Sequence, residues 1–224
     1  MPDAARRTKI AGSARARLLL RCRAHAASAT LALGSMLALL AGACTGAASR
    51  PPMPPPPSVQ EPGPDSPRAE EVRLHALLNE YRIANHLAPV PLSPSLSKVA
   101  RAHAADLSAH GFNDTCSIHS WSVGGPWTPC CYDMRRPNGK CMWNKPRELS
   151  AYQGVGFEIA YRYSAGVRAG RALQTWRDSP VHNAVILNLG GWREQQWRAV
   201  GVGIDGEYAT VWWGEETDPA ADSR

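Results

Sequence analysis

The chain has 224 residues and a mass of 24.2 kDa, with 44% hydrophobic and 20% charged residues. This length supports one folded core with extensions and excludes a large multidomain machine. The formal net charge of +6 does not indicate a nucleic-acid partner, because residues 1–43 hold seven of the 25 Lys and Arg residues and only one of the 19 acidic ones. The rest of the chain is therefore balanced in charge, and we expect no binding to nucleic acid.

The N-terminal region has the order of an export signal. Its cations precede an uncharged run rich in Leu and Ala at residues 26–43, which ends on small residues directly before Cys44. This predicts an export signal over residues 1–43. Small residues before a cysteine resemble the lipobox of bacterial lipoproteins, which implies cleavage and lipidation at Cys44 and a membrane anchor.

Two other interpretations of the same region stay open. Residues 26–43 are at the lower limit of length for crossing a bilayer, so an uncleaved transmembrane anchor is one alternative. Cleavage before Cys44 followed by secretion is the other. All three interpretations place the rest of the chain outside the cytoplasm, in or beyond the cell envelope.

Residues 44–68 are predicted to be a linker. Nine of the 19 prolines lie between Pro51 and Pro67, with almost no large apolar side chains. Such a segment favours an extended polyproline-II spacer, although it could also be a ligand for a proline-recognising domain. We place the folded domain at residues 69–218 and a short tail at residues 219–224.

Helical spacing of apolar residues is clearest in two segments, at residues 72–83 and 96–107. The second segment has Ser93 as its N-cap, a proline at its first helical position and Gly111 at its end. A weaker pattern predicts a helix at residues 165–177. A serine and proline repeat the cap signature at residues 179–180 and predict a short helix that runs to residue 187.

Three strands are predicted in the second half of the domain. Apolar residues alternate with others over Val155–Tyr161, and two further strands fit Arg198–Ile204 and Tyr208–Trp213. Between the last two, Asp205 and Gly206 indicate a type I′ hairpin turn. Helices and strands in this order predict a mixed α/β domain.

The segment from residue 112 to 149 shows no period, but it carries four cysteines. Loops of this length are uncommon unless they are cross-linked or functional. In an oxidising compartment the cysteines predict two disulfides. A bridge between the adjacent Cys130 and Cys131 would be strained, so we expect Cys116 and Cys141 each to pair with one of them. The alternative is a zinc knuckle that uses Cys116 and His119.

Several short motifs follow one another in an order that resembles the CAP superfamily, above all its bacterial branch. This superfamily includes cysteine-rich secretory proteins, venom antigens and pathogenesis-related proteins. The motifs are Leu77-Leu78-Asn79-Glu80-Tyr81-Arg82, Ala102-His103-Ala104, His119-Ser120, Gly156-Phe157-Glu158-Ile159, Trp176-Arg177-Asp178-Ser179-Pro180-Val181-His182 and Val200-Gly201-Val202-Gly203. The resemblance covers about residues 70–217 and implies a three-layer α-β-α sandwich.

The resemblance also implies a cleft with two His and two Glu residues that often holds a divalent metal. His119 and His182 match the two histidines, and Glu158 matches one glutamate if Gly-Phe-Glu stands for the family's Gly-Glu-Asn. The position of the other glutamate, three residues after Trp176, is Ser179 here. The expected cleft is thus His119, Glu158, Ser179 and His182, with the two histidines as ligands of Zn²⁺ or another divalent cation. We interpret His75, His86, His103 and His110 as packing or surface residues.

Two functions are consistent with this cleft. The first is a non-catalytic, envelope-anchored CAP domain that binds a metal and a lipid, sterol or envelope protein, because Ser179 replaces a carboxylate. The second is a metal-dependent, peptidase-like hydrolase with Glu158 as general base on a metal-bound water. A nucleophilic serine at Ser120 or Ser179 is a further chemistry, although capping a helix would compete for the Ser179 hydroxyl. The eight tryptophans are expected in the core, or in an exposed aromatic groove.

Overall fold

The computed structural model describes residues 66–135 and 139–221. The predicted export signal, the lipidation site at Cys44 and almost all of the proline-rich linker lie outside these residues. Within the described ranges, no helix is both long enough and apolar enough to cross a membrane.

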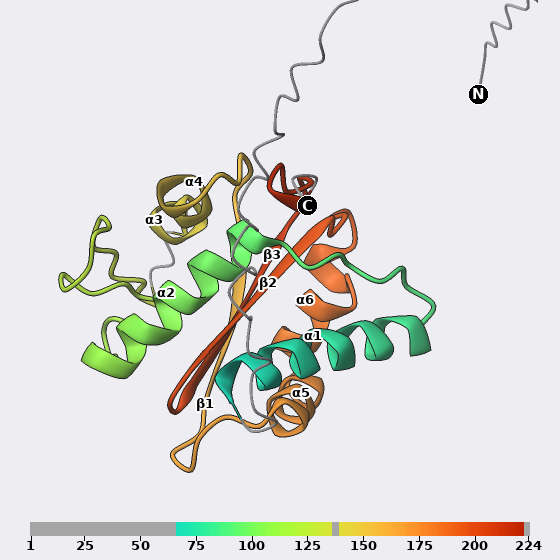
Figure 1. The fold of residues 1–224 in the computed structure, drawn as a ribbon, viewed down its shortest axis with the longest axis horizontal. Coiled ribbons are helices and arrows are strands. Elements are labelled where there is room, and N and C mark those ends of the chain that lie inside the picture. The colour runs from blue at the N-terminus through green and yellow to red at the C-terminus, as the bar shows by residue number, and fades with distance from the viewer. Residues whose placement is uncertain (1–65, 136–138, 222–224) are drawn as a thin grey trace, which may run out of the picture. The chain divides into compact units, whose positions relative to one another are not determined.

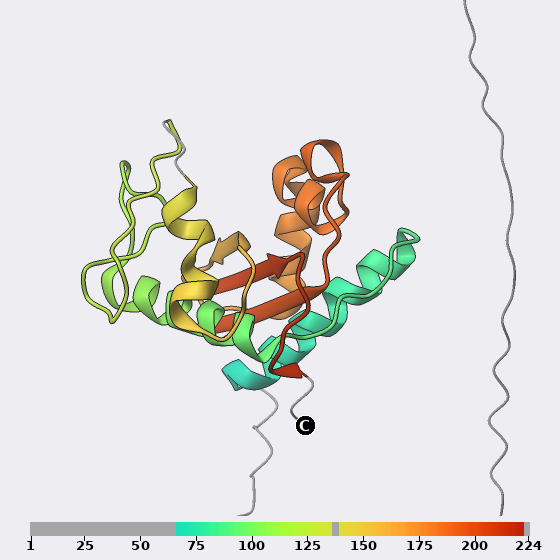
Figure 2. The same ribbon diagram turned by 90° about the horizontal axis from the view of Figure 1, so that it is seen from above.

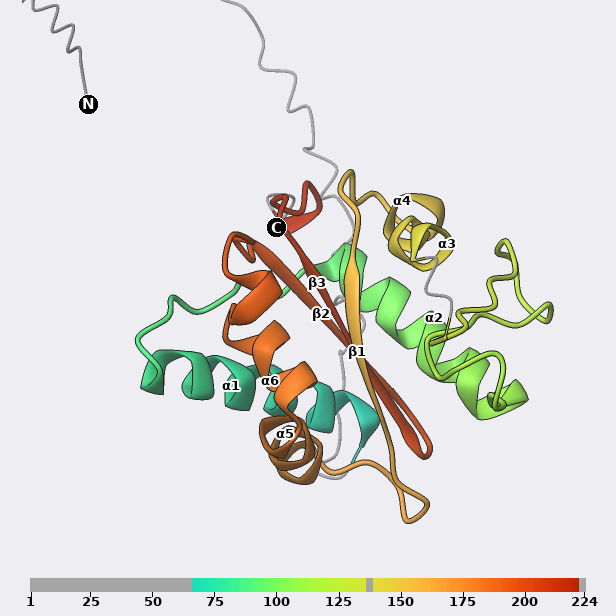
Figure 3. The ribbon, with the colours of Figure 1, turned by 180° about the vertical axis from the view of Figure 1, so that it is seen from behind.

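The described residues form three layers (Figure 1). The middle layer is an antiparallel sheet with the strand order β1-β3-β2. Helix α2 packs on β2 and β3, while α1 and α5 pack together beyond the opposite face, where α6 joins them (Figure 3). This confirms the α-β-α sandwich. The elements are α1 (Pro67–Ala84), α2 (Pro94–His110), α3 (Lys140–Trp143), α4 (Lys145–Leu149), β1 (Phe157–Arg162), α5 (Ala169–Asp178), α6 (Pro180–Ile186), the 3-10 turn η1 (Gly190–Trp192), β2 (Ala199–Asp205) and β3 (Tyr208–Gly214).

Local signals in the sequence determine where α2 begins and ends. The Ser93 hydroxyl accepts a hydrogen bond from the Leu96 amide at 2.9 Å, and Pro94 occupies the first turn. Gly111, at φ 68°, ends the helix in a conformation that favours glycine. These bounds agree with the prediction.

Helix α5 begins at Ala169, later than the predicted residue 165. Gly166 adopts φ 84°, which interrupts helical geometry before that point. The Glu70 carboxylate of α1 then accepts a hydrogen bond from the Ala169 amide at 2.6 Å. A side chain distant in sequence thus provides the hydrogen-bond acceptor for an amide in the first turn of α5, and no local pattern could reveal this.

The β2–β3 hairpin has a different turn from the predicted one. Asp205 pairs with Tyr208, so the two loop residues are Gly206 and Glu207. Of these two, only Gly206 has a positive φ, at 52°. Glycine at the first central position is typical of a type II′ turn, whereas type I′ needs positive φ at both positions.

Two apolar clusters fill the spaces between the layers. The larger lies between the sheet and α1, α5 and α6, and the smaller lies between the sheet, α2 and the loop that follows α2. Five of the eight tryptophans are buried, namely Trp121, Trp176, Trp197, Trp212 and Trp213. The core interpretation therefore holds for these five, while Trp143 is 36% exposed.

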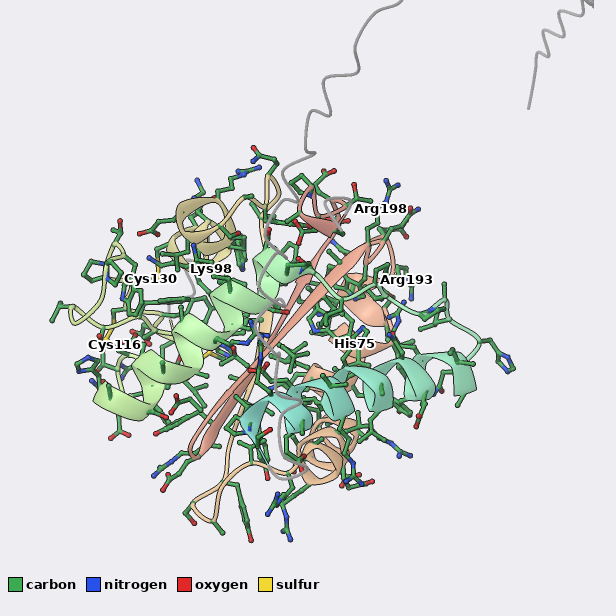
Figure 4. All side chains as sticks on the ribbon, viewed as in Figure 1. His75, Lys98, Cys116, Cys130, Arg193 and Arg198 are labelled. Atoms are coloured by element: carbon green, nitrogen blue, oxygen red, sulfur yellow. A yellow bond between two sulfur atoms is a disulfide. The ribbon has the colours of Figure 1, made fainter. Side chains whose placement is uncertain are left out.

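Two disulfides cross-link the loop between α2 and α4, which we call the disulfide loop (residues 111–144). Cys116 pairs with Cys131, and Cys130 pairs with Cys141. Each outer cysteine is therefore joined to one of the adjacent pair, as predicted, and the zinc knuckle is wrong because its cysteine is oxidised. Cys116 and Cys130 lie beside α2 (Figure 4). Helices α3 and α4 were not predicted from the sequence.

Candidate functional site

Glu158 on β1 connects two parts of the chain that are far apart in sequence. Its side chain is fully buried, and each carboxylate oxygen meets an imidazole. Oε1 lies 2.5 Å from Nδ1 of His103 on α2, and Oε2 lies 2.8 Å from Nδ1 of His119 in the disulfide loop. The carboxylate thus fixes the loop to the sheet and to the helix.

The surroundings of His103 favour an imidazolium. Its Nδ1 faces the Glu158 carboxylate, and its Nε2 lies 2.9 Å from the carbonyl oxygen of Ser120. The Ser120 carbonyl can only accept, and so can Glu158 in its ionised form, so both ring nitrogens carry a proton when Glu158 is ionised. The ring also stacks on Trp121, with centroids 4.4 Å apart and planes within 8°. His103 and Glu158 therefore form a buried ion pair.

The pKa shifts of the two groups agree with this assignment. Burial lowers the pKa of His103, but the charge and hydrogen bond of Glu158, the Ser120 carbonyl and the charge of Asp106 together raise it above its ordinary value. Burial raises the pKa of Glu158, but His103 and His119 together hold it below its ordinary value. Each partner stabilises the charged form of the other.

His119 is oriented by the same carboxylate. Because Glu158 accepts at Nδ1, the ring holds a proton on that nitrogen, and Nε2 has no hydrogen-bond partner among the described residues. The side chain is 15% exposed. A carboxylate that fixes the tautomer of a histidine is typical of a positioned functional imidazole. Glu158 thus serves as a positioning residue for His119.

Ser179 and His182 form a second pair at the start of α6. The Ser179 hydroxyl lies 2.8 Å from Nδ1 of His182. Ser179 occupies the N-cap position, but its side chain makes no capping hydrogen bond, so the predicted capping role of its hydroxyl is wrong. Burial and the nearby charge of His119 lower the pKa of His182. The two pairs are thus close enough to interact electrically.

The two pairs come from opposite sides of the sheet. His119 belongs to the disulfide loop, which stands with α3 and α4 on one side, and His182 belongs to α6 on the other (Figure 2). The four residues named from the sequence are therefore arranged as His119 with Glu158 and Ser179 with His182. Ser120 has another role, because its hydroxyl accepts from the Tyr132 amide at 2.9 Å and its residue is buried.

His103 is the residue of this site whose role the sequence did not reveal. The sequence predicts a packing or surface residue, and His103 is fully buried, but it also holds the charge that pairs with Glu158. Two signals were present. His103 lies on the apolar stripe of α2, and it belongs to one of the motifs that carry the CAP resemblance.

The donor set does not complete a metal site. Both oxygens of Glu158 are engaged by imidazoles, and Ser179 stands where a second carboxylate was expected, so only Nε2 of His119 and Nε2 of His182 remain as strong ligands. Over residues 66–135 and 139–221, no three His, Cys, Asp or Glu side chains are arranged to hold a metal ion. Catalytic zinc sites use three protein ligands. The two free imidazole nitrogens therefore do not fit a catalytic zinc site.

The ion pair predicts a distinct dependence of stability on pH. The pKa of Glu158 is lowered from 4.5 in the folded state, so its contribution is present above 4.5 and is lost as pH falls through the folded value. The pKa of His103 is raised from 6.5, so its contribution is present below 6.5 and is lost as pH rises through the folded value.

Urea denaturation across this pH range measures the effect. The stability difference between the wild type and a His103→Gln/Glu158→Gln variant should be largest between about pH 4.5 and 6.5 and shrink on both sides. A difference that does not change with pH would contradict the charged state of the pair.

Three solved structures show a distant similarity to the chain. The chain is similar to an extracellular SCP-domain protein of Bacillus anthracis (16% identity, TM-score 0.45, 66% of this chain and 41% of that chain). It is also similar to an outer surface protein of Borrelia burgdorferi (15%, 0.48, 68% and 96%) and to a cysteine-rich secretory protein of Staphylococcus aureus (12%, 0.46, 68% and 40%). It thus spans about two fifths of the length of the Bacillus and Staphylococcus chains.

No curated protein sequence matches the chain. The model of the cysteine-rich secretory protein family, CAP, matches residues 75–190, which is more than half of the chain. This match includes His103, His119, Glu158 and His182, the residues that build the site. The chain belongs to the cysteine-rich secretory protein (CAP) family.

Proposed function

We propose that this chain is a non-catalytic binding module of the CAP family that acts outside the cytoplasm. One observation carries the proposal: the Glu158 carboxylate is buried and bonded to two imidazoles. A general base must reach the proton that it removes, and this carboxylate has no free oxygen for that purpose. Hydrogen-bonding groups of His119, Ser179 and His182 remain for contact with a ligand.

The location of the module follows from its cysteines and its N-terminal sequence. Two disulfides are typical of proteins that fold in an oxidising compartment. The signal-like residues 1–43 and the cysteine at position 44 favour an envelope lipoprotein held on a proline-rich linker. The module would then meet lipids, sterols or envelope proteins, and these are the ligand classes that we propose.

A binding experiment with defined probes tests this function. Palmitate, cholesterol and a random nonapeptide library are offered to the purified full chain and to a His119→Gln/His182→Gln variant. We expect at least one probe to bind the wild type and to bind the variant at least tenfold more weakly. His110→Gln is the matched control, because His110 lies on α2 with its side chain 45% exposed.

The hydrolase alternative is tested on the same peptides. Mass spectrometry follows their cleavage with and without added zinc, for the wild type and for Glu158→Gln. We expect no cleavage by either protein. Turnover that the wild type shows and Glu158→Gln lacks would overturn the proposal and make Glu158 the base of a hydrolase.

A further inference from the structure

A pocket lies between α1 and α2 at the β2 edge of the sheet. Both helices contact β2, whereas β1, which carries Glu158, forms the opposite edge (Figure 1). The pocket has a volume of about 370 Å³, which is within the range of small-molecule sites. Its lining includes Arg68, Glu71, Val72, Leu92, Arg101 and Ala220. The pocket is therefore distinct from the site that His119, Ser179 and His182 form.

Glu71 of α1 is the buried charged group of this pocket, with its side chain 5% exposed. The Ile204 amide of β2 donates to one of its oxygens at 3.2 Å. The two oxygens lie 3.0 and 2.9 Å from Nε of Arg101, and Nη1 of Arg68 donates to the same carboxylate at 3.2 Å. Two guanidinium groups thus share one carboxylate. Among the described lining residues no other side chain is charged, so the pocket has an excess of one positive charge.

Both arginines keep donors that have no partner among the described residues. Arg101 uses only Nε, and Arg68 uses only Nη1. Their side chains are 38% and 58% exposed, so a ligand can reach them from solvent. The two terminal nitrogens of a guanidinium form a planar fork that fits two oxygens of a carboxylate or a phosphate. The free donors therefore favour an oxyanion as the ligand group.

The surface beside these donors is apolar and exposed. Val72 is 64% exposed and Leu92 is 37% exposed, and both line the pocket. Covering such surface is favourable, because apolar groups are then removed from water. An inorganic ion would leave these side chains in contact with water, whereas an organic anion would cover them with its apolar part. The lining therefore favours an oxyanion that is attached to an apolar group.

We propose that this pocket binds a small organic anion. Its carboxylate or phosphate lies on Arg68 and Arg101, and its apolar group lies against Val72 and Leu92. This is a second binding site, and it does not depend on the function proposed above. Glu71 has two opposing effects on it, because its carboxylate holds the two guanidinium groups at the pocket and also competes with the ligand for their charge.

An NMR titration of the full chain tests the proposal. The probes are hexanoate and hexyl phosphate, and the amide signals of Val202 and Ile204 report binding, since both residues belong to the strand beside the pocket. Acetate and 1-hexanol each carry one half of hexanoate. We expect the better of the two probes to bind about tenfold more tightly than either half, because the halves lose the apolar or the charged contact. The better probe also identifies the oxyanion as a carboxylate or a phosphate.

Arg101→Gln is the main variant. It removes the free guanidinium fork and should weaken binding of the better probe by about tenfold. Arg73→Gln is the matched control, because Arg73 is an exposed arginine of α1 that does not line the pocket. It should leave the affinity unchanged. Val72→Ser should weaken binding of the probe but not of acetate.

Glu71→Gln distinguishes a ligand site from an ion pair that only stabilises the fold. Glutamine keeps an oxygen for the Ile204 amide and removes the charge that competes with the ligand. We expect the better probe to bind this variant about threefold more tightly, whereas a merely structural ion pair predicts no gain. The Arg101→Gln comparison decides the proposal even if Glu71→Gln does not fold.

Three results would overturn the anion site. The first is that neither probe binds, and the second is that Arg101→Gln and Arg73→Gln bind the better probe equally. The third is a change of the Val202 and Ile204 signals with protein concentration alone, which would assign the pocket to a second copy of the chain.

The two proposals fail separately. A probe that binds Arg101→Gln normally but is lost in His119→Gln/His182→Gln occupies the other site, which supports the binding module and overturns the anion site. A probe that is lost in Arg101→Gln and kept in the double histidine variant supports the anion site, whatever the outcome for palmitate, cholesterol and the peptides.

Discussion

Replacing His103 with alanine is expected to lower the free energy of unfolding by about 3–5 kcal/mol, the range found when one partner of a buried ion pair is removed. The change leaves the Glu158 carboxylate buried without its cation and leaves the Ser120 carbonyl without its donor. It also removes the ring that stacks on Trp121. Urea denaturation at neutral pH measures the loss.

Two controls separate the ion pair from general damage to α2. His110→Ala alters an exposed histidine on the same helix and should change stability by no more than about 0.5 kcal/mol. A double-mutant cycle between His103→Ala and Glu158→Gln should show a coupling energy of about 1–3 kcal/mol, because each single change already breaks the pair. A loss below about 1 kcal/mol for His103→Ala, or additive effects in the cycle, would show that no buried ion pair forms.

Removal of the Cys130–Cys141 disulfide by a double change to serine is expected to cost about 3 kcal/mol. Part of this cost is the regained freedom of the unfolded chain, because the bridge closes a loop with a sequence separation of 11. The rest comes from the packing of Cys130, which is 3% exposed and lies in the apolar cluster with Trp121. Thermal and urea unfolding of the variant measure the loss.

The second disulfide provides the comparison. Cys116–Cys131 has a sequence separation of 15, so loop entropy alone would make the two losses nearly equal. The buried position of Cys130 should make the loss of its own bridge the larger of the two. A larger loss of stability on removal of Cys116–Cys131 would show that the burial of Cys130 does not contribute to stability. Because His119 lies in this loop, both variants should also weaken ligand binding.

The sequence predicted the elements whose signals are local. Helix α2 carries its own cap, proline and terminal glycine, and the alternation in β1 is visible within six residues. Features that depend on distant partners were missed or misplaced. The start of α5 depends on the Glu70 carboxylate, while helix α3 forms inside the disulfide loop and helix α4 follows directly after it.

The residues of the candidate site also differ in how far the sequence could predict their roles. His119, Glu158, Ser179 and His182 were found because they lie in motifs of the CAP family. The role of His103 depends on a strand 55 residues away, which brings the carboxylate to Nδ1. The hydroxyl of Ser179 was expected to cap α6, but the ring of His182 competes for it. The first contact cannot be seen in a local pattern, whereas the second joins residues only three positions apart, where a capping serine gives the same sequence pattern.

The protonation of the histidines tests the central claim most directly. This claim is that both carboxylate oxygens of Glu158 accept hydrogen bonds from imidazoles. Nitrogen NMR of the histidine side chains in the full chain reports which ring nitrogens carry protons. We predict that at neutral pH His103 is protonated on both nitrogens and that His119 donates its Nδ1 proton to Glu158. A singly protonated His103 at neutral pH would contradict the ion pair, and an Nδ1 without a proton on His103 or His119 would leave a Glu158 oxygen available as a base.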